Sequence, residues 1–431
     1  MISVEDALAF VLKHFQPLES ERVPLLEALD RVLTEDIASD INVPPFNNSA
    51  MDGYAVIADE IAPASRDHPV TLRVIGDVAA GYTATRAVER GTAMRIMTGA
   101  TLPPGADTVV RFEETSEGQG KAALTKDAPP SPNGVTLFSP PRTRVDILKA
   151  IARGENVRAA GEDIRGGQVV FPKGTVVRPA EIGVLASLGH KSVSVHRRPR
   201  VAILATGDEL VAIDAPIAPG KIRNSNEYSN AAAVLKAGGV PVQLGIARDN
   251  VPDLTAKIRA GLDADVDLFL TSAGVSVGDY DIVKDVLNAE GEMRFWQVKM
   301  KPGKPLAFGV LHGSKPVPLL GLPGNPVSAM ISFEVFARPA ILTMLGKTEF
   351  VRPSVRAVLQ EEVKNDSRRR NFIRVVVEKR GEGYLERLTG EQGSGILMSV
   401  ARANGLLVVP EDVVLVRAGE VVEIQLLNSE R

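Results

Sequence analysis

The sequence predicts a multidomain protein of α/β plus β structure, built around a central, doubly wound and mainly parallel α/β domain. Short apolar strands alternate with helical stretches over residues 179–346, a pattern typical of a parallel sheet with helices on both faces. Elsewhere short β-type runs lie between Gly and Pro turns, which predicts β-rich domains. A length of 431 residues agrees with about three domains.

Changes of pattern along the chain indicate where the domains begin and end. Ser3 can cap a first helix over Val4 to Phe15, and apolar residues at helical spacing predict a second helix over residues 25–33. Short strands such as Val70 to Ile75 follow, and a Pro-rich stretch over residues 127–143 leads out of that region. We therefore expect a discontinuous helical N-terminal domain (1–47 and 145–178), an inserted β-rich domain (48–144), an α/β domain (179–346) and a C-terminal β-barrel-like domain (347–431).

Three apolar strands of the α/β domain run into polar loops. They cover residues 201–206, 268–272 and 319–322, and helical stretches cover residues 230–237, 252–262 and 282–289. Asn325 can cap the helix after the third strand, with Pro326 at its first position. Ligands of such sheets bind at the carboxyl ends of the strands, so we expect all three loops on one edge.

The segment LFLTSAGVSVGDYDIVK, residues 268–284, is the most informative in the chain. Its strand runs into a Gly/Ser-rich turn, where backbone amides and the positive end of the next helix form an anion site. Three lysines surround a Pro-Gly turn over residues 299–304, and an acidic pair follows Gly207. Amides and lysines suit a phosphate, and carboxylates suit a hard divalent cation. The pattern predicts a phosphorylated or nucleotide-like small molecule with magnesium.

Composition excludes several classes of protein. The net charge of -3 and the scattered basic residues argue against a nucleic-acid binder. The chain has no cysteine, which excludes disulfides, thiolate metal sites and a cysteine nucleophile, and its five histidines lack metal-ligand spacing. The acidic N-terminus does not resemble a signal peptide, and no apolar run approaches a membrane span. We expect a cytoplasmic protein with no membrane partner.

Taken in order, a series of motifs resembles the molybdopterin molybdenumtransferases, the family that includes the E domain of gephyrin. The motifs are SAMDGYA (49–55), MTGA (97–100) with PGAD (104–107), RAAGEDI (158–164), TGDEL (206–210), SAGVSVGDYD (272–281), KPGKP (301–305) and LPGNPVS (322–328). Each is weak alone, but their joint order over the whole chain is specific. Ala273 is a departure, because a second glycine is expected at that position.

The resemblance implies a reaction and an assembly. Adenylylated molybdopterin and molybdate would yield molybdenum cofactor and AMP, with Mg²⁺ assisting. The protein would be an elongated homodimer with its site between subunits, lined by the α/β domain of one and the β-rich domains of the other. The pterin dithiolene would supply sulfur to the metal, which fits the absence of cysteine. Molybdopterin adenylyltransferase and molybdoenzymes would be its protein partners.

The resemblance also implies the functional residues. The catalytic candidates are Asp52, Thr98, Asp163, Glu209, Asp249 and Asp281. Three of these, Glu209, Asp249 and Asp281, are also the candidate Mg²⁺ ligands. The substrate-binding candidates are Thr206, Gly207, Ser272, Gly274, Ser276, Gly278, Lys299, Lys301, Lys304, Pro323, Gly324, Asn325 and Ser394.

Several of these residues also have a structural interpretation. Asp52 precedes a glycine and can simply form a turn. Glu209 can stabilise a helix start, and Asp249 can cap the helix that begins near residue 252. Asp279 or Asp281 can be a cap, and the family position favours Asp281. Ser394 lies in QGSG, which resembles the serine-bearing oxyanion loop of the family and equally a Gly-rich hairpin turn.

Three other functions compete with this one. GVSVG, residues 274–278, matches the G-x-S-x-G elbow of a serine hydrolase, for which His312 is the one later histidine. The α/β region alone resembles molybdopterin adenylyltransferases, which attach AMP, but the additional β domains argue against that step. A non-catalytic scaffold is the third, although no long linker or second module supports it.

Overall fold

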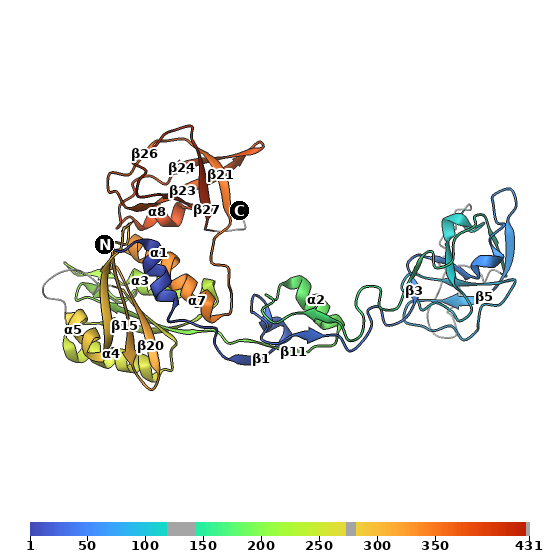
Figure 1. The fold of residues 1–431 in the computed structure, drawn as a ribbon, viewed down its shortest axis with the longest axis horizontal. Coiled ribbons are helices and arrows are strands. Elements are labelled where there is room, and N and C mark those ends of the chain that lie inside the picture. Colours follow the sequence, from blue (N-terminus) through green and yellow to red (C-terminus); the bar gives the residue numbers. More distant parts are fainter. Residues whose placement is uncertain (119–142, 273–281, 428–431) are drawn as a thin grey trace. The chain divides into compact units, whose positions relative to one another are not determined.

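A six-stranded sheet forms the centre of the α/β region in the computed structural model, which describes residues 1–118, 143–272 and 282–427 (Figure 1). The strand order is β15-β12-β16-β20-β19-β17. The strands are β12 (Arg200–Thr206), β15 (Val240–Ala247), β16 (Leu268–Ser272), β17 (Gly291–Gln297), β19 (Pro305–His312) and β20 (Pro316–Leu322). Neighbours are parallel from β15 to β20, and β19 and β17 continue the sheet in antiparallel fashion. The mainly parallel sheet is confirmed.

Helices cover both faces of this sheet because its central strands bury side chains on both sides. One apolar cluster joins Val201, Leu268 and Leu320 to the helices α1, α3, α6 and α7. A second joins Ala202 and Phe269 to α4 and α5, so the two groups of helices lie on opposite faces (Figure 1). The helices are α1 (Val4–Leu12), α3 (Ser225–Ala237), α4 (Val251–Asp263), α5 (Ile282–Glu290), α6 (Pro326–Ser332) and α7 (Arg338–Met344).

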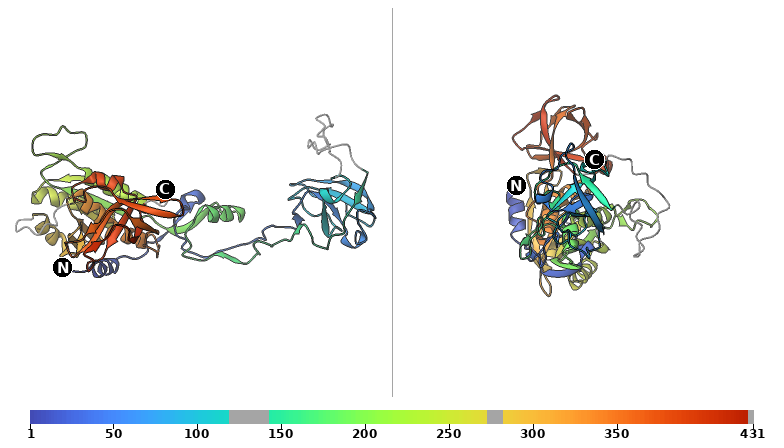
Figure 2. Two further views of the ribbon diagram at one scale, coloured as in Figure 1. Left: turned by 90° about the horizontal axis from the view of Figure 1, so that it is seen from above. Right: turned by 90° about the vertical axis from the view of Figure 1, so that its right-hand side faces the viewer.

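The helix α1 lies with much later parts of the chain. Its Val4, Ala7 and Val11 belong to the same cluster as α7, and the turned views show this N-terminal helix beside the orange and red segments (Figure 2). It ends at Leu12, three residues earlier than predicted.

The apolar stretch after β20 is a core helix of the α/β region. α6 and α7 are joined by a π-helical segment, Phe333–Ala337. The helix Pro326–Met344 is apolar enough to cross a membrane, but 72% of its window is buried in the protein. Packing against the sheet therefore accounts for its apolar character.

The C-terminal region forms a closed barrel. Its strands pair in the order β23-β24-β21-β27-β25, and β25 pairs back to β23, which confirms the predicted barrel-like architecture. They are β21 (Ser354–Leu359), β23 (Arg370–Arg380), β24 (Gly383–Leu388), β25 (Gly405–Val409) and β27 (Val421–Leu426), beside the shorter β18 (Met300–Lys301), β22 (Val363–Lys364), β26 (Leu415–Val416) and the helix α8 (Leu397–Arg402).

The predicted second helix is wrong. Residues Leu25–Ala28 form one 3-10 turn after β1 (Ser20–Pro24), which pairs with β11 (Ser192–His196). Leu26 is 79% exposed, and Asp30 has a φ of 61°, which ends any helix. The amides of Leu25, Asp30 and Leu33 donate instead to the carbonyls of Lys191, Val177 and Thr175. These contacts with residues distant in sequence overrode the local apolar spacing.

By its internal contacts the chain divides into two units, the second formed by residues 36–173 and 183–190. This unit contains a five-stranded sheet in the order β7-β4-β6-β5-β8, which confirms the predicted β-rich character. The strands of the second unit, inside and outside this sheet, are β2 (Ile37–Ala38), β3 (Asn48–Ser49), β4 (Gly53–Val56), β5 (Val70–Val78), β6 (Thr92–Ile96), β7 (Thr108–Arg111), β8 (Arg144–Ile147), β9 (Val157–Arg158) and β10 (Val169–Phe171). The finer division into four domains stays a prediction.

The remaining short elements lie in both units. They are η2 (Ala58–Glu60), η3 (Phe112–Glu114), α2 (Pro179–Ser187), β13 (Leu210–Val211) and β14 (Ile222–Arg223).

Candidate functional site

The carboxyl ends of β12, β16 and β20 form one edge of the main sheet, which we call the ligand edge. Ala205 pairs with Ser272, and Ser272 pairs with Leu322, so the three loops that follow begin side by side. Thr206 and Ser272 are both buried at this edge. The Ser272 hydroxyl has no hydrogen-bond partner within the described ranges. The parallel register of β12, β16 and β20 thus makes the three loops start at the same edge, as predicted.

The loops after β12 and β15 are joined by reciprocal hydrogen bonds between two acidic residues. The Asp208 amide donates to the Asp249 carboxylate, and the Asp249 amide donates to the Asp208 carboxylate, both at 3.3 Å. The cap of α4 is Asn250, whose side chain accepts from the Asp253 amide at 3.0 Å. The alternative interpretation of Asp249 as the helix cap is therefore wrong, and its exposed carboxylate faces the Asp208 loop.

The turn after β12 requires glycine. Gly207 has a φ of 141°, and a Cβ atom there would lie 2.3 Å from Oε2 of Glu209. The Glu209 carboxylate therefore folds back over the end of its own strand. An alanine at residue 207 would be strained and would displace this carboxylate.

The lysine segment lies against the start of β23. Met300 pairs with Arg370 and Lys301 with Asn371, and Arg369 donates to the Met300 carbonyl at 3.2 Å. Lys299 and Lys301 are exposed and Lys304 is half-buried. The C-terminal barrel thus adds arginines to the lysines that the sequence singles out.

The loop Pro323–Asn325 lies between two other segments. Asn226 at the start of α3 donates to the Gly324 carbonyl at 2.7 Å. Asn325 occupies the predicted N-cap position of α6, but its side chain makes no capping hydrogen bond within the described part of the chain. Beyond it, the Val327 amide donates to the Ser394 carbonyl at 3.1 Å. The serine loop of the barrel is therefore joined to the helix start at the ligand edge.

Arg374 is a residue that the sequence analysis missed. It is 1% exposed, and its guanidinium donates to the Ser399 hydroxyl and to the carbonyls of Phe372 and Gly393 at 3.2–3.3 Å. Among the described residues no carboxylate pairs with it, and burial lowers its pKa to about 10. One arginine inside the apolar run NFIRVVV (371–377) is the signal that would have found it.

A buried guanidinium without a carboxylate attracts an anion. Desolvation of a charge is costly unless an opposite charge compensates it. Because Arg374 contacts the serine loop through Gly393, the oxyanion interpretation of that loop gains over a plain hairpin turn.

Two predicted residues of the other unit are in direct contact. The Asp52 carboxylate accepts from the Thr98 amide at 2.7 Å and from the Thr98 hydroxyl at 2.8 Å, and both residues are exposed. Asp163 is exposed as well, but no described hydrogen bond links its side chain to this pair. The structure brings together two of the three.

Four candidates, Gly274, Ser276, Gly278 and Asp281, lie outside the described residues. Within the described ranges no three His, Asp or Glu side chains form a cluster that could hold a metal. Mg²⁺ needs only one or two carboxylates beside waters and phosphate oxygens, so the donor set of Glu209 and Asp249 fits that ion.

The described residues give the serine hydrolase alternative no support. His312 is the last residue of β19 and pairs with Pro316, the first residue of β20. Ser272, from which the GVSVG turn departs, pairs instead with Leu322 at the other end of β20. Six residues of extended strand span about 20 Å, so His312 and Ser272 lie at opposite ends of β20. The serine of the motif, Ser276, lies outside the described residues.

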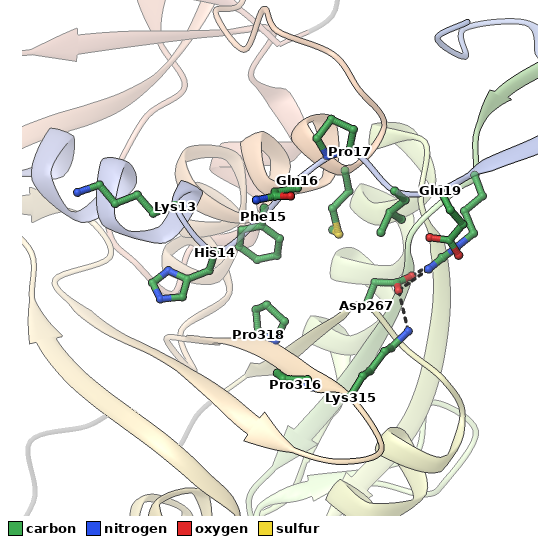
Figure 3. Close-up of a pocket in the computed structure, with 13 residues that line it drawn as sticks. Lys13, His14, Phe15, Gln16, Pro17, Glu19, Asp267, Lys315, Pro316 and Pro318 are labelled. Carbon is green, nitrogen blue, oxygen red and sulfur yellow. Dashed lines mark hydrogen bonds and ion pairs between the residues drawn. The ribbon is translucent and has the colours of Figure 1, made fainter. Parts of the chain in front are cut away.

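A cleft of about 510 Å³ opens at the opposite edge of the sheet, where the parallel strands begin (Figure 3). Most of its charged side chains belong to one ion-paired group: Asp267 accepts from Arg197 at 2.6 and 2.7 Å and from Lys315 at 3.1 Å. The cleft is therefore an ion-paired structural contact, away from the ligand edge.

Comparison with known proteins covers nearly the whole chain. Residues 2–189 match the MoeA N-terminal region (domain I and II), residues 202–343 a probable molybdopterin binding domain, and residues 356–427 the MoeA C-terminal region (domain IV). A Mycobacterium tuberculosis protein named molybdopterin molybdenumtransferase 2 is 36% identical over 97% of this chain and 98% of its own. The chain belongs to the molybdopterin molybdenumtransferase family.

Other members of the family agree in sequence and in fold. The Bacillus subtilis molybdopterin molybdenumtransferase is 34% identical over 100% of this chain and 95% of its own. The crystal structure of the molybdopterin biosynthesis moeA protein from Pyrococcus horikoshii OT3 is 30% identical with a TM-score of 0.79, over 99% of this chain and 100% of that one. The resemblance and the fold class predicted from the sequence are confirmed.

Proposed function

We propose that this chain inserts molybdate into adenylylated molybdopterin, releasing AMP and forming molybdenum cofactor. Its membership of a family of molybdenumtransferases supports the reaction type. The observation that carries the proposal is the hydrogen bond between Val327 and Ser394. It joins the start of α6 to a loop that the buried Arg374 also contacts.

The residues of the ligand edge would divide the work by charge. Glu209, Asp249 and Asp281 would hold Mg²⁺, which supplies polarisation of the phosphate when bound. Lys301 and Lys304, on either side of a Pro-Gly turn, would neutralise oxyanions.

Binding positions follow from the same loops. The amides of the loops after β12, β16 and β20 would bind phosphate and pterin groups, with Lys299 and Ser394 at the side of the barrel. Molybdate is a substrate in this scheme.

We further propose a cytoplasmic homodimer whose site combines both units. The motivation is that the Asp52–Thr98 pair belongs to one unit and the ligand edge to the other. Mixing an Asp52→Ala chain with an Asp281→Ala chain should restore activity, because one hybrid site then carries neither substitution. Failure of complementation in heterodimers confirmed by mass would contradict a composite site.

The function is tested by single-turnover release of AMP from adenylylated molybdopterin with molybdate, over a range of Mg²⁺ concentrations. Asp249→Ala should slow release about a hundredfold, the scale expected when a positioned electrostatic group is lost. Asp265→Ala is the matched control, because this exposed carboxylate lies before β16, at the opposite edge. Wild-type protein that releases no AMP, or equal loss in both variants, would refute the proposal.

A further inference from the structure

The side chain of Gln392 replaces a strand neighbour for Arg374. β24 ends at Leu388, which pairs with Val375, and the next residue, Thr389, still donates to the Arg374 carbonyl. The Gln392 side-chain oxygen accepts from the Arg374 amide at 2.9 Å, and its nitrogen donates to the Arg374 carbonyl at 3.1 Å. Gln392 therefore takes the place of a strand carbonyl for the Arg374 amide, and it shares the Arg374 carbonyl with the amide and hydroxyl of Thr389, which donate at 3.2 Å.

The loop that begins with Gln392 is held at its other positions too. Arg374 donates from its guanidinium to the Gly393 carbonyl at 3.3 Å, and the Ser394 carbonyl accepts from the Val327 amide at 3.1 Å. Consecutive residues 392, 393 and 394 are thus fixed to the barrel strand, to the buried cation and to the helix α6. Little freedom is left for the loop to shift along β23.

We infer that Gln392 is a positioning residue for the oxyanion substrate, acting by fixing the register of the serine loop between Arg374 and the start of α6. This inference rests on the proposed function. Without the amide clamp, the loop can slide relative to the cation and the helix amides, and oxyanion sites lose affinity steeply with displacements of about 1 Å. The effect should fall on molybdate and spare the nucleotide.

The barrel contains a matched control for this clamp. Asn404 accepts from the Val377 amide at 2.8 Å and donates to the Val377 carbonyl at 2.9 Å. It extends the other neighbour of β23 in the same way, since it immediately precedes β25. Among the described residues Asn404 makes no hydrogen bond to the serine loop, so its loss should weaken the barrel without moving that loop.

The experiment compares Gln392→Ala, Gln392→Met and Asn404→Ala in the full-length protein. Methionine keeps the length of glutamine but forms no hydrogen-bonded clamp. Both Gln392 variants should raise the Kd for molybdate, measured by calorimetry without pterin, and the KM for molybdate in cofactor formation, each by about tenfold. The kcat at saturating molybdate and the Kd for AMP should stay within about twofold of wild type.

The outcomes separate a positioning role from a structural one. Asn404→Ala should lower the melting temperature at least as much as Gln392→Ala and leave both molybdate constants unchanged. Equal rises in the molybdate constants for Asn404→Ala, or wild-type constants for either Gln392 variant, would overturn the inference. Wild-type protein that forms no cofactor would instead refute the proposed function.

Discussion

Replacing Glu386 by glutamine should stabilise the C-terminal barrel at alkaline pH and remove most of its pH dependence. Glu386 lies on β24 between Val377 of β23 and Leu359 of β21 and is 0% exposed. Neither of its carboxylate oxygens has a hydrogen-bond partner among the described residues. Burial, with a smaller contribution from the charge of Glu361, raises its pKa from 4.5 to about 7.

The size and sign of the effect follow from proton linkage. One pKa unit corresponds to about 1.4 kcal/mol, so the rise from 4.5 to about 7 corresponds to about 3 kcal/mol. The folded state holds the proton more tightly than the unfolded state. The free energy of unfolding is therefore undiminished below pH 4.5, falls as pH rises, and has lost the full amount above about pH 7.

Glutamine matches the protonated acid in shape and charge. The variant should therefore equal wild type near pH 4 and exceed it by about 3 kcal/mol at pH 8. Amide hydrogen exchange of β23 and β24 in the native protein measures opening of the barrel without requiring the whole chain to unfold in one step. A wild-type opening free energy that is the same at pH 5 and pH 8, or a variant that follows the wild-type curve, would refute the reasoning.

Three further predictions concern the α/β region. Asp267→Asn removes the charge that Arg197 binds and should cost about 3 kcal/mol in a denaturant titration at pH 7. Burial raises the pKa of Asp267, but hydrogen bonds, first of all from Arg197, outweigh burial and leave this pKa lowered. The stability advantage of wild type should therefore vanish as pH falls below 3.8, and its persistence there would contradict the prediction. Gly207→Ala should reduce AMP release about a hundredfold by displacing Glu209, and a variant with wild-type turnover would show that this carboxylate is not needed. Ser276→Ala should retain most cofactor-forming activity, whereas esterase activity in wild type that this change abolishes would revive the hydrolase interpretation.

Sequence pattern alone was sufficient wherever the structure depends on neighbours in the chain. The central strands read as continuous apolar runs because both of their faces are buried. Asn325 followed by Pro326 marked the start of α6, since capping is a property of one turn of chain. Parallel strands then put the loops after Thr206 and Ser272 on one edge, a consequence of topology that alternation predicts.

The tertiary structure decided the features that depend on distant partners. Local spacing predicted a helix over residues 25–33, but main-chain hydrogen bonds from this segment to residues 175–191 prevented it. The link between Val327 and Ser394 joins residues from two domains, and no periodicity encodes it. The burial of Arg374 and the clamp of Gln392 are set by where β24 ends. Hydrogen-bond partners and desolvation act between side chains adjacent in space, whereas capping and periodicity act between residues adjacent in sequence.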